Sequence, residues 1–367
     1  MNFNDNQLRA HVLPLLQLPE VRDVTLVTDR DVSPLPKLQV VIPPHWLARI
    51  CTRAGAKLAV CLWLAVRARR DWIMGFHFVP HGFNARVVGA LTGTKSLYHM
   101  IGGESEWAGG GWDSENRVLG RQRRPSAALE RLFFRLIKGC TAVATMGEAS
   151  RAALLERGLD AARVRVIPPS VDGSRFHAVE GGSRRYDIVT VGRLAPRKRT
   201  ADLLRAVAEL RRLRPTVTAA VAGDGPLASE LRLLAEELGI ADCVDFLGFR
   251  GDVEDVYASA RVFVLTSESE GLPISMLEAM SASVPCVVSA VGEIPGVVVD
   301  GESGFLFDPG DIETLVGRLD MLLGDESLQA ALGAGGARLA RDIASIAAVA
   351  RRYQDLFVAT AARAVAR

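Results

Sequence analysis

Short apolar runs alternate with amphipathic stretches along the second half of the chain. Tyr186–Val191 is rich in β-branched residues and predicts a strand, and Thr200–Leu213, with apolar residues at helical spacing, predicts the helix that follows. Further strands are predicted at 217–222, 244–247, 262–266 and 284–289, and helices at 226–238, 253–260 and 273–281. Strands that alternate with helices predict a parallel sheet in a doubly wound α/β domain.

The first half of the chain follows the same pattern less clearly. Strands are predicted at 24–28, 39–42, 72–76, 96–101, 141–145 and 163–167, and helices at 128–138 and 149–158. A long loop is predicted at 102–124, and loops of that length inside a compact domain are often functional. The polar, glycine-bearing segment 180–185 is the predicted domain boundary. The alanine-rich segment 327–367 predicts helix.

Length and composition indicate a globular protein of about two domains. The 367 residues are 49% hydrophobic and 23% charged, which excludes a disordered chain. The longest uncharged apolar run, Leu58–Val66, falls well short of the roughly 20 residues of a membrane-spanning helix. The N-terminal residues lack the apolar core of a signal peptide, and the five scattered cysteines indicate neither a disulfide framework nor a metal site. We therefore expect a cytoplasmic protein.

Charge is distributed unevenly between the two halves of the chain. Residues 1–180 carry 24 basic and 16 acidic residues, a net charge of +8, whereas residues 181–367 carry 20 and 26, a net charge of −6. A basic half is typical of a protein with an anionic partner, such as a membrane surface, a lipid phosphate or a nucleic acid. Frequent arginine on solvated faces is an equally good explanation.

Two basic clusters stand out in the first half. The first surrounds the apolar run Leu58–Val66, as in an interfacial amphipathic helix: Arg49, Arg53, Lys57, Arg67, Arg69 and Arg70. A core helix with basic ends is the alternative, but an interfacial helix would face an anionic leaflet. The second cluster, Arg121–Arg124, has no aromatic platform and belongs to no nucleic-acid-binding module, so nucleic acid is not an expected partner.

The segment Glu270–Glu278 is the strongest candidate for chemistry. It follows an apolar strand, and the carboxyl ends of parallel strands are where open α/β sheets bind ligands. Gly271 allows close backbone approach, and a helix beginning at Pro273 would offer free amides to an anion such as a diphosphate. Glu278 leans back toward the helix start, so two carboxylates would accept hydrogen bonds from sugar and ribose hydroxyls. A helix with two solvated glutamates is the alternative.

A second candidate segment is Gly192–Arg199, which directly follows the strand Tyr186–Val191. Arginine and lysine at the end of a strand suit a diphosphate, because one offers a planar fork and the other a point charge. A solvated basic loop is the alternative. Since both segments follow strands of one predicted sheet, we expect them at the same edge of that sheet.

Several motifs together resemble family-4 retaining, nucleotide-sugar-dependent glycosyltransferases with the GT-B fold, over residues 186–320. They are Arg193-Leu194 with Lys198, GDGPL at 223–227, FLG at 246–248, SESEGLP at 267–273, EAM at 278–280 and DGESGFLFDPGD at 300–311. The resemblance implies two Rossmann-like, doubly wound α/β domains that face a central cleft. Residues 1–180 would bind the acceptor, with the family's first strand expected to be missing, and residues 181–340 would bind the nucleotide sugar. A C-terminal helix at 341–367 would return to the N-terminal domain.

The resemblance assigns the chemistry of transfer to three side chains. Arg193 and Lys198 would hold the donor diphosphate and stabilise the leaving group as it gains charge. Glu270 would contact the donor sugar. These two cations would stabilise the negative charge of the leaving group, which a bound metal ion does in other enzymes. Neither a metal nor a cofactor is therefore expected.

The resemblance also assigns the remaining donor contacts. Glu278 would bind the ribose hydroxyls, and the amides of Gly271 and Leu272 would contact sugar or phosphate. Phe249 and Arg250, which follow the predicted strand 244–247, would lie near the base.

In the first half the resemblance is in outline only. The segment Asp71–Gly82 places His77 after a strand, and Thr94–Gly103 contains His99 and Gly102. These three residues are the candidates for the acceptor side. For each histidine, a hydrogen-bonded structural role is the alternative.

The resemblance thus implies a hexosyltransferase that moves a sugar from a UDP- or GDP-sugar to a saccharide or lipid-linked saccharide. We expect a role in cell-surface polysaccharide synthesis, with the protein cytoplasmic or peripheral on the inner face of a membrane. The alternatives are a nucleotide-sugar epimerase and a non-catalytic nucleotide-sugar-binding protein. The combination of Arg193 and Lys198 with the Glu270–Glu278 spacing favours the transferase.

Overall fold

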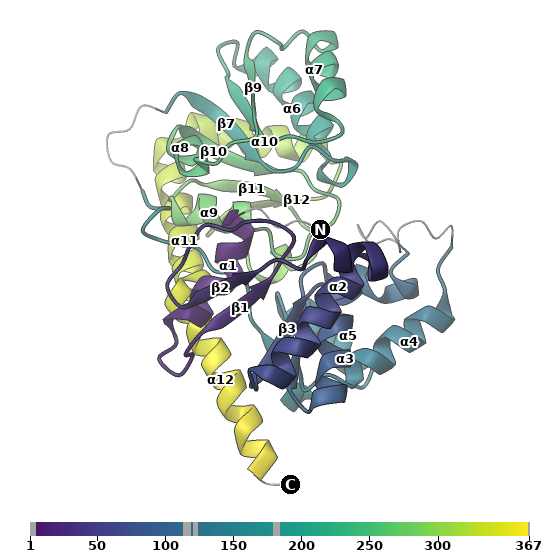
Figure 1. The fold of residues 1–367 in the computed structure, drawn as a ribbon. Coiled ribbons are helices and arrows are strands. Elements are labelled where there is room, and N and C mark those ends of the chain that lie inside the picture. The colour runs from purple at the N-terminus through teal and green to yellow at the C-terminus, as the bar shows by residue number, and fades with distance from the viewer. Residues whose placement is uncertain (1–4, 113–118, 120–123, 179–183, 366–367) are drawn as a thin grey trace. The chain divides into compact units, whose positions relative to one another are not determined.

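The computed structural model describes residues 5–112, 119, 124–178 and 184–365, and shows an α/β protein built on parallel sheets (Figure 1). The chain divides into two compact units. Unit 1 comprises Met1–Pro169 and Val349–Arg367, and unit 2 comprises Ser170–Ala348.

Unit 1 contains a two-stranded and a four-stranded parallel sheet within the described residues. The first pairs β1 (Val24–Val27) with β2 (Leu38–Val41). The second has the order β3-β4-β5-β6, formed by Trp72–Phe76, Lys95–Met100, Ala142–Thr145 and Val164–Val166. The helices of this unit are α1 (Asp5–Gln17), α2 (His45–Arg67), α3 (Phe83–Thr92), α4 (Ala127–Lys138), α5 (Glu148–Glu156) and most of α12 (Ile346–Val365).

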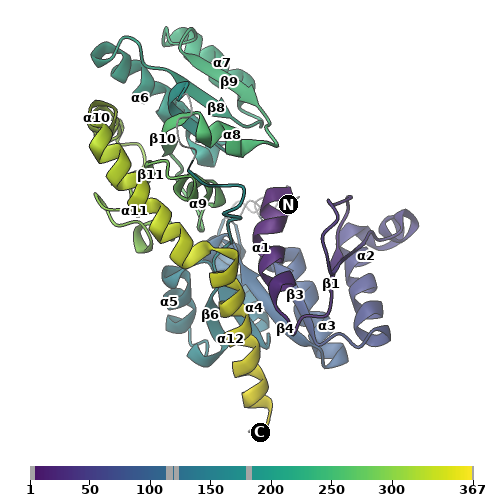
Figure 2. The same cartoon turned by 90° about the vertical axis from the view of Figure 1, so that its left-hand side faces the viewer.

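Both faces of the four-stranded sheet are covered. Successive residues of β4 point to opposite faces, so Leu97 joins one core and Tyr98 the other. On the Leu97 face, Leu15 of α1 and Tyr353 of α12 pack against the sheet, and on the Tyr98 face Phe133 of α4 does so. The C-terminal helix α12 (yellow in Figure 2) therefore packs on the N-terminal sheet, as expected.

Unit 2 is a doubly wound domain around a six-stranded parallel sheet of order β12-β11-β10-β7-β8-β9. In chain order β7 to β12 are Tyr186–Val191, Ala219–Ala222, Val244–Gly248, Ala260–Leu265, Cys286–Ser289 and Phe305–Phe307. The helices are α6 (Thr200–Leu213), α7 (Ala228–Glu237), α8 (Val253–Ala258), α9 (Ile274–Ser281), α10 (Ile312–Gly324) and α11 (Glu326–Ala344). The strand order reverses between β7 and β10, which makes their carboxyl ends the switch point where such sheets bind ligands.

The boundary between the units differs from the predicted segment 180–185, part of which lies outside the described residues. The residues just before it pack on unit 2, because the Val171 amide donates to the Ala344 carbonyl at 2.7 Å and Ser281 Oγ donates to the Phe176 carbonyl at 2.7 Å. The boundary therefore falls at Pro169 and Ser170. In the predicted loop 102–124, short 3-10 turns form at Gly103–Glu106 and Ala108–Gly110, and residues 113–118 and 120–123 lie outside the described part.

Candidate functional site

The carboxyl ends of β7 and β10 lie side by side, because these two strands pair in register from Ala260 and Tyr186 onward. Hydrogen bonds join the segments that follow them: Thr266 Oγ1 donates to the carbonyls of Lys198 and Arg199 at 2.9 and 3.0 Å. The Glu268 amide also donates to the carbonyl of residue 197 at 2.8 Å. The structure thus brings together the two segments that the sequence singled out.

Lys198 and Glu270 form a buried ion pair at this edge. Lys198 Nζ lies 2.5 Å from Glu270 Oε1, and Ser267 Oγ donates to the same oxygen at 2.6 Å. The Glu270 side chain is 8% exposed and that of Lys198 is 20% exposed. Burial acts to raise the pKa of the Glu270 carboxyl, but the ammonium of Lys198 and the Ser267 hydroxyl outweigh it and hold that pKa below its ordinary value. Glu270 is therefore an ionised side chain that orients the Lys198 ammonium.

Glu278 has a different environment, although it lies on the helix that follows Glu270. Its side chain is buried, and Tyr257 Oη donates to its Oε2 at 3.0 Å. Burial raises the pKa of this carboxyl to about 7, because the Tyr257 hydroxyl and the charge of Arg175 offset only part of the desolvation. Neither Glu270 nor Glu278 is a solvated helix residue, so that alternative is wrong.

The backbone between these two glutamates is held close to the loop after β11. The Glu293 amide donates to the Gly271 carbonyl at 3.1 Å. Gly292 has a φ of +59°, and a Cβ there would lie 1.9 Å from the Glu270 carbonyl oxygen, so only glycine fits. Leu272 is buried, and α9 begins after Pro273. The amides of the first turn of α9 have no partner inside the helix and remain available at this edge.

The backbone next to Arg193 is held by hydrogen bonds and close packing, whereas its side chain is exposed. The Leu194 amide donates to the Asp224 carbonyl at 3.0 Å, and a Cβ on Gly225 would lie 2.2 Å from the Leu194 carbonyl oxygen. The Arg193 side chain is exposed, and no acidic partner for it occurs among the described residues. Its guanidinium is therefore available to an anion at the carboxyl end of β7.

Phe249 and Arg250 lie farther along the same edge, after the outermost strand β9. The Phe249 ring is 69% exposed, whereas Arg250 is paired with Asp252 at 2.5 and 2.7 Å. The Gly223 amide donates to the Gly248 carbonyl at 2.8 Å, which ties the loop after β8 to the end of β9. In the sheet, β8 separates β9 from β7, the strand that precedes Lys198.

The acceptor-side candidates in unit 1 fall in different environments. His99 is fully buried in β4, with Nε2 at 2.9 Å from the Ile167 carbonyl and Nδ1 at 3.3 Å from the Tyr353 hydroxyl. Burial lowers its pKa to about 4. The structure thus favours the structural alternative for His99. His77 follows β3, has a φ of +58° and a side chain 16% exposed, and Gly102 follows β4.

Sequence reasoning missed Glu106, a buried carboxylate that joins the loops after β3 and β4. Its two oxygens are contacted at 2.5–3.0 Å by His77 Nδ1, the amides of Phe78, Ile101 and Gly102, and the Tyr98 hydroxyl. Burial acts to raise the pKa of this carboxyl, but these contacts outweigh it and hold the pKa below its ordinary value. Glu106 therefore fixes the positions of His77 and Gly102, and nothing in the local sequence distinguishes it from the neighbouring Glu104.

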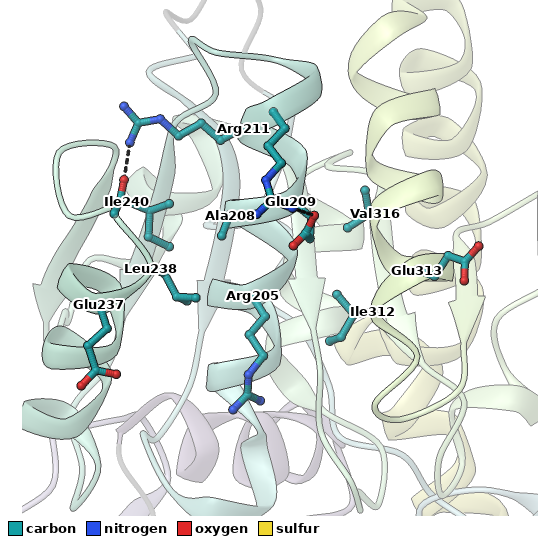
Figure 3. A pocket seen from close by; sticks show the side chains of 12 residues that line it. Arg205, Ala208, Glu209, Arg211, Glu237, Leu238, Ile240, Ile312, Glu313 and Val316 are labelled. Carbon is teal, nitrogen blue, oxygen red and sulfur yellow. Dashed lines mark hydrogen bonds and ion pairs between the residues drawn. The ribbon is translucent and has the colours of Figure 1, made fainter.

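An open cavity of about 920 Å³ lies elsewhere on unit 2, among α6, the end of α7 and the start of α10 (Figure 3). Its three arginines are engaged in ion pairs: Arg205 with Asp202, Arg211 with Asp242 and Arg212 with Glu209. The cavity includes no residue of the segments 192–199 and 270–278. We therefore do not count it as part of the candidate site.

Comparison with known proteins identifies the part of the chain that carries the ion pair. Residues 176–338 match the family model for Glycosyl transferases group 1. This region is therefore similar to group 1 glycosyltransferase domains. The matched region includes both segments at the edge of the sheet.

Curated relatives that the chain resembles include two bacterial transferases. The chain is 34% identical over 198 residues to the GDP-mannose-dependent alpha-(1-6)-phosphatidylinositol monomannoside mannosyltransferase of Mycolicibacterium smegmatis, a match that covers 48% of this chain and 51% of that protein. It is 36% identical over 192 residues to the D-inositol 3-phosphate glycosyltransferase of Corynebacterium jeikeium, with 46% of each protein covered. The chain thus spans about half the length of these relatives.

Solved structures show the fold over nearly the whole chain. HepE from Anabaena, in complex with UDP and glucose, has a TM-score of 0.75 at 18% identity, with 97% of this chain and 96% of that chain covered. Sucrose-phosphate synthase from Thermosynechococcus elongatus has a TM-score of 0.71 at 19% identity, with 92% and 89% covered. Both confirm the expected GT-B fold with two Rossmann-like domains.

Proposed function

We propose that this protein transfers a sugar, with retention of configuration, from a UDP- or GDP-sugar to a saccharide or lipid-linked saccharide. A role in cell-surface polysaccharide synthesis is part of the proposal. The observation that carries it is the buried Lys198–Glu270 pair at the switch point of the six-stranded sheet, with the exposed guanidinium of Arg193 on the same segment as Lys198. Such a cationic edge beside a helix start suits a diphosphate.

Binding of the donor would use the whole carboxyl edge of the sheet. Arg193, Lys198 and the first amides of α9 would hold the diphosphate, with the amides of Gly271 and Leu272 at the junction with the sugar. Glu278, buried on α9, would accept hydrogen bonds from the ribose. The exposed ring of Phe249, with Arg250 beside it, would lie along the base.

Transfer would depend on charge that develops on the leaving group. As the bond between the anomeric carbon and the diphosphate oxygen breaks, negative charge grows on that oxygen, and Lys198 and Arg193 stabilise it. The acceptor hydroxyl oxygen bonds to the anomeric carbon on the same face, and its proton passes to the departing phosphate oxygen. Glu270 holds Lys198 in place and accepts a hydrogen bond from a sugar hydroxyl. No metal ion or cofactor takes part in this scheme.

The acceptor side would be provided by unit 1. We propose His77 and Gly102 for it, because Glu106 fixes the loops that carry both. The relatives act on inositol-containing acceptors, as their names state, which is consistent with a hydroxyl-rich acceptor here.

The proposal is tested by donor binding followed by turnover. Among UDP-, GDP- and ADP-sugars, one or more UDP- or GDP-sugars should raise the melting temperature of the protein, because a ligand that binds only the native state stabilises it. With that donor and a saccharide acceptor, the product should keep the anomeric configuration of the donor. Binding without transfer to any acceptor would instead indicate a non-catalytic protein, and conversion of the donor to an epimer would indicate an epimerase.

A further inference from the structure

Helix α2 of unit 1 exposes large apolar side chains to solvent. Its backbone leaves the helical conformation at residues 51–52, so it consists of two segments. The first segment presents Trp46 and Ile50, which are 62% and 76% exposed, and the second presents Trp63 and Val66, which are 61% and 69% exposed. Spacings of three and four residues place each pair on one helix face. We call these four residues, with the arginines described next, the α2 surface.

Four exposed arginines flank these apolar side chains, and none has an acidic partner among the described residues: Arg49, Arg53, Arg67 and Arg69. The other two basic residues of this cluster are neutralised, because Lys57 pairs with Asp29 at 2.7 Å and Arg70 pairs with Asp23. The charge imbalance extends beyond the helix: residues 32–103 contain nine basic residues and one acidic residue. This part of unit 1 is therefore strongly cationic.

An anionic lipid surface matches both properties of the α2 surface. Exposed tryptophan and aliphatic side chains are favoured at the boundary between headgroups and acyl chains, and arginine is attracted to anionic headgroups. A nucleic acid would match the charge but would leave the aliphatic side chains exposed. In the described part of the chain, every helix is too short or too polar to cross a membrane. The surface thus suits a helix that lies in the interface.

We propose that the α2 surface docks unit 1 on an anionic lipid bilayer. Trp46, Ile50, Trp63 and Val66 enter the headgroup region, and the four arginines bind lipid phosphates. This docking goes beyond the transfer reaction and does not depend on the donor site. Together with the proposed function, it would bring the enzyme to lipid-linked acceptors.

Vesicle flotation tests the proposal with the full chain. The protein should float with vesicles of phosphatidylcholine mixed with phosphatidylglycerol, far less with phosphatidylcholine alone, and less as the salt concentration rises. Replacing the four arginines by glutamine should lower the partition coefficient by about fivefold per arginine on the anionic vesicles. The double variant Trp46→Ala/Trp63→Ala should lower it by up to about a hundredfold per ring and retain the salt dependence.

Two control variants carry matched changes in unit 2. Leu213→Ala/Leu233→Ala removes side chains that are 61% and 58% exposed, and Arg338→Gln/Arg341→Gln removes two exposed arginines from α11. Both controls should float as the unchanged protein does, and all variants should melt at the same temperature. The proposal fails if the unchanged protein does not float with anionic vesicles at low salt, or if the α2 variants float equally well. A dimer abolished by the tryptophan replacements, or preferential binding of RNA, would also overturn it.

Discussion

Replacing Lys198 by methionine tests the central ion pair of unit 2. The change removes the ammonium 2.5 Å from Glu270 Oε1 and leaves a buried carboxylate whose remaining donor, among the described residues, is the Ser267 hydroxyl. Removing one partner of a buried pair typically costs about 3–5 kcal/mol. Protonation of Glu270 limits that cost here. Glu278, which is similarly buried and receives one hydroxyl, has a pKa of about 7, and raising a carboxyl from 4.5 to that value costs about 3 kcal/mol.

The comparison of Glu270 with Glu278 also gives the sign of the pH dependence of stability. In the unchanged protein the pKa of Glu270 is depressed, so its pairing stabilises the fold above the unfolded-state pKa and is lost as pH falls through the folded-state value. In Lys198→Met the pKa is raised instead, so that variant loses stability as pH rises from about 4.5 to 7. The difference in unfolding free energy should therefore increase by up to about 3 kcal/mol from pH 5 to pH 8.

Urea denaturation of the two proteins at pH 5 and pH 8 measures this difference. The double variant Lys198→Met/Glu270→Gln should recover most of the stability at pH 8, because no buried charge remains, yet it should stay inactive. Each single change, Lys198→Ala or Glu270→Ala, should abolish detectable turnover, since one transition-state donor alone is worth about 10²–10³ in rate. The reasoning is refuted if the stability difference does not vary with pH, or if either alanine variant transfers sugar at the normal rate.

Three further predictions concern other parts of the two units. In the unchanged protein, the raised pKa of Glu278 should lower the stability as pH rises from about 4.5 to 7, and Glu278→Gln should abolish this loss. The same change should weaken donor binding measured by calorimetry. Glu106→Gln should destabilise the protein by about 1–3 kcal/mol in thermal denaturation, because the amide replaces one acceptor oxygen by a donor facing bound N–H groups. Gly292→Ala should lower both the stability and the donor affinity, because the new Cβ would lie 1.9 Å from the Glu270 carbonyl oxygen. Gly317→Ala is the control: this glycine lies on α10 with open space around it, so the change should be neutral or stabilising in the same assays.

The elements of unit 2 from β7 to β11 were predictable because their patterns are unambiguous, whereas helix α10 was not predicted. β7 and α6 have the predicted bounds, since one is a short β-branched run and the other a clean apolar stripe. In unit 1 helix α3 was missed: its start follows Pro80 and Gly82 and has no side-chain cap, so the usual signals of a helix start are lacking. The three-residue strand β12 is too short to show any period.

Site residues were predictable only where neighbouring strands position them. The pairing of β7 with β10 follows from their hydrophobic patterns and the general topology of doubly wound sheets, and it brings Lys198 to Glu270. The contacts of Glu106 depend on the conformation of the irregular loops after β3 and β4. The hydrophobic pattern of a sequence does not predict the conformation of such loops. His99 lies on a strand buried on both faces, so its polarity alone could not show that it points into the core.

The two glutamates of the E-x₇-E spacing demonstrate why residue type and spacing do not determine chemistry. Both side chains are buried within one short stretch of chain, yet the pKa of Glu270 is lowered and that of Glu278 is raised to about 7. The difference comes from Lys198, which follows β7 and pairs with Glu270, whereas Glu278 has the Tyr257 hydroxyl and the charge of Arg175. Glu270 is therefore a fixed negative charge that positions a cation, whereas Glu278 is close to half ionised near neutral pH. In the proposed complex, ribose hydroxyls that donate to Glu278 would favour its ionised form, so donor binding would be coupled to proton release at that residue.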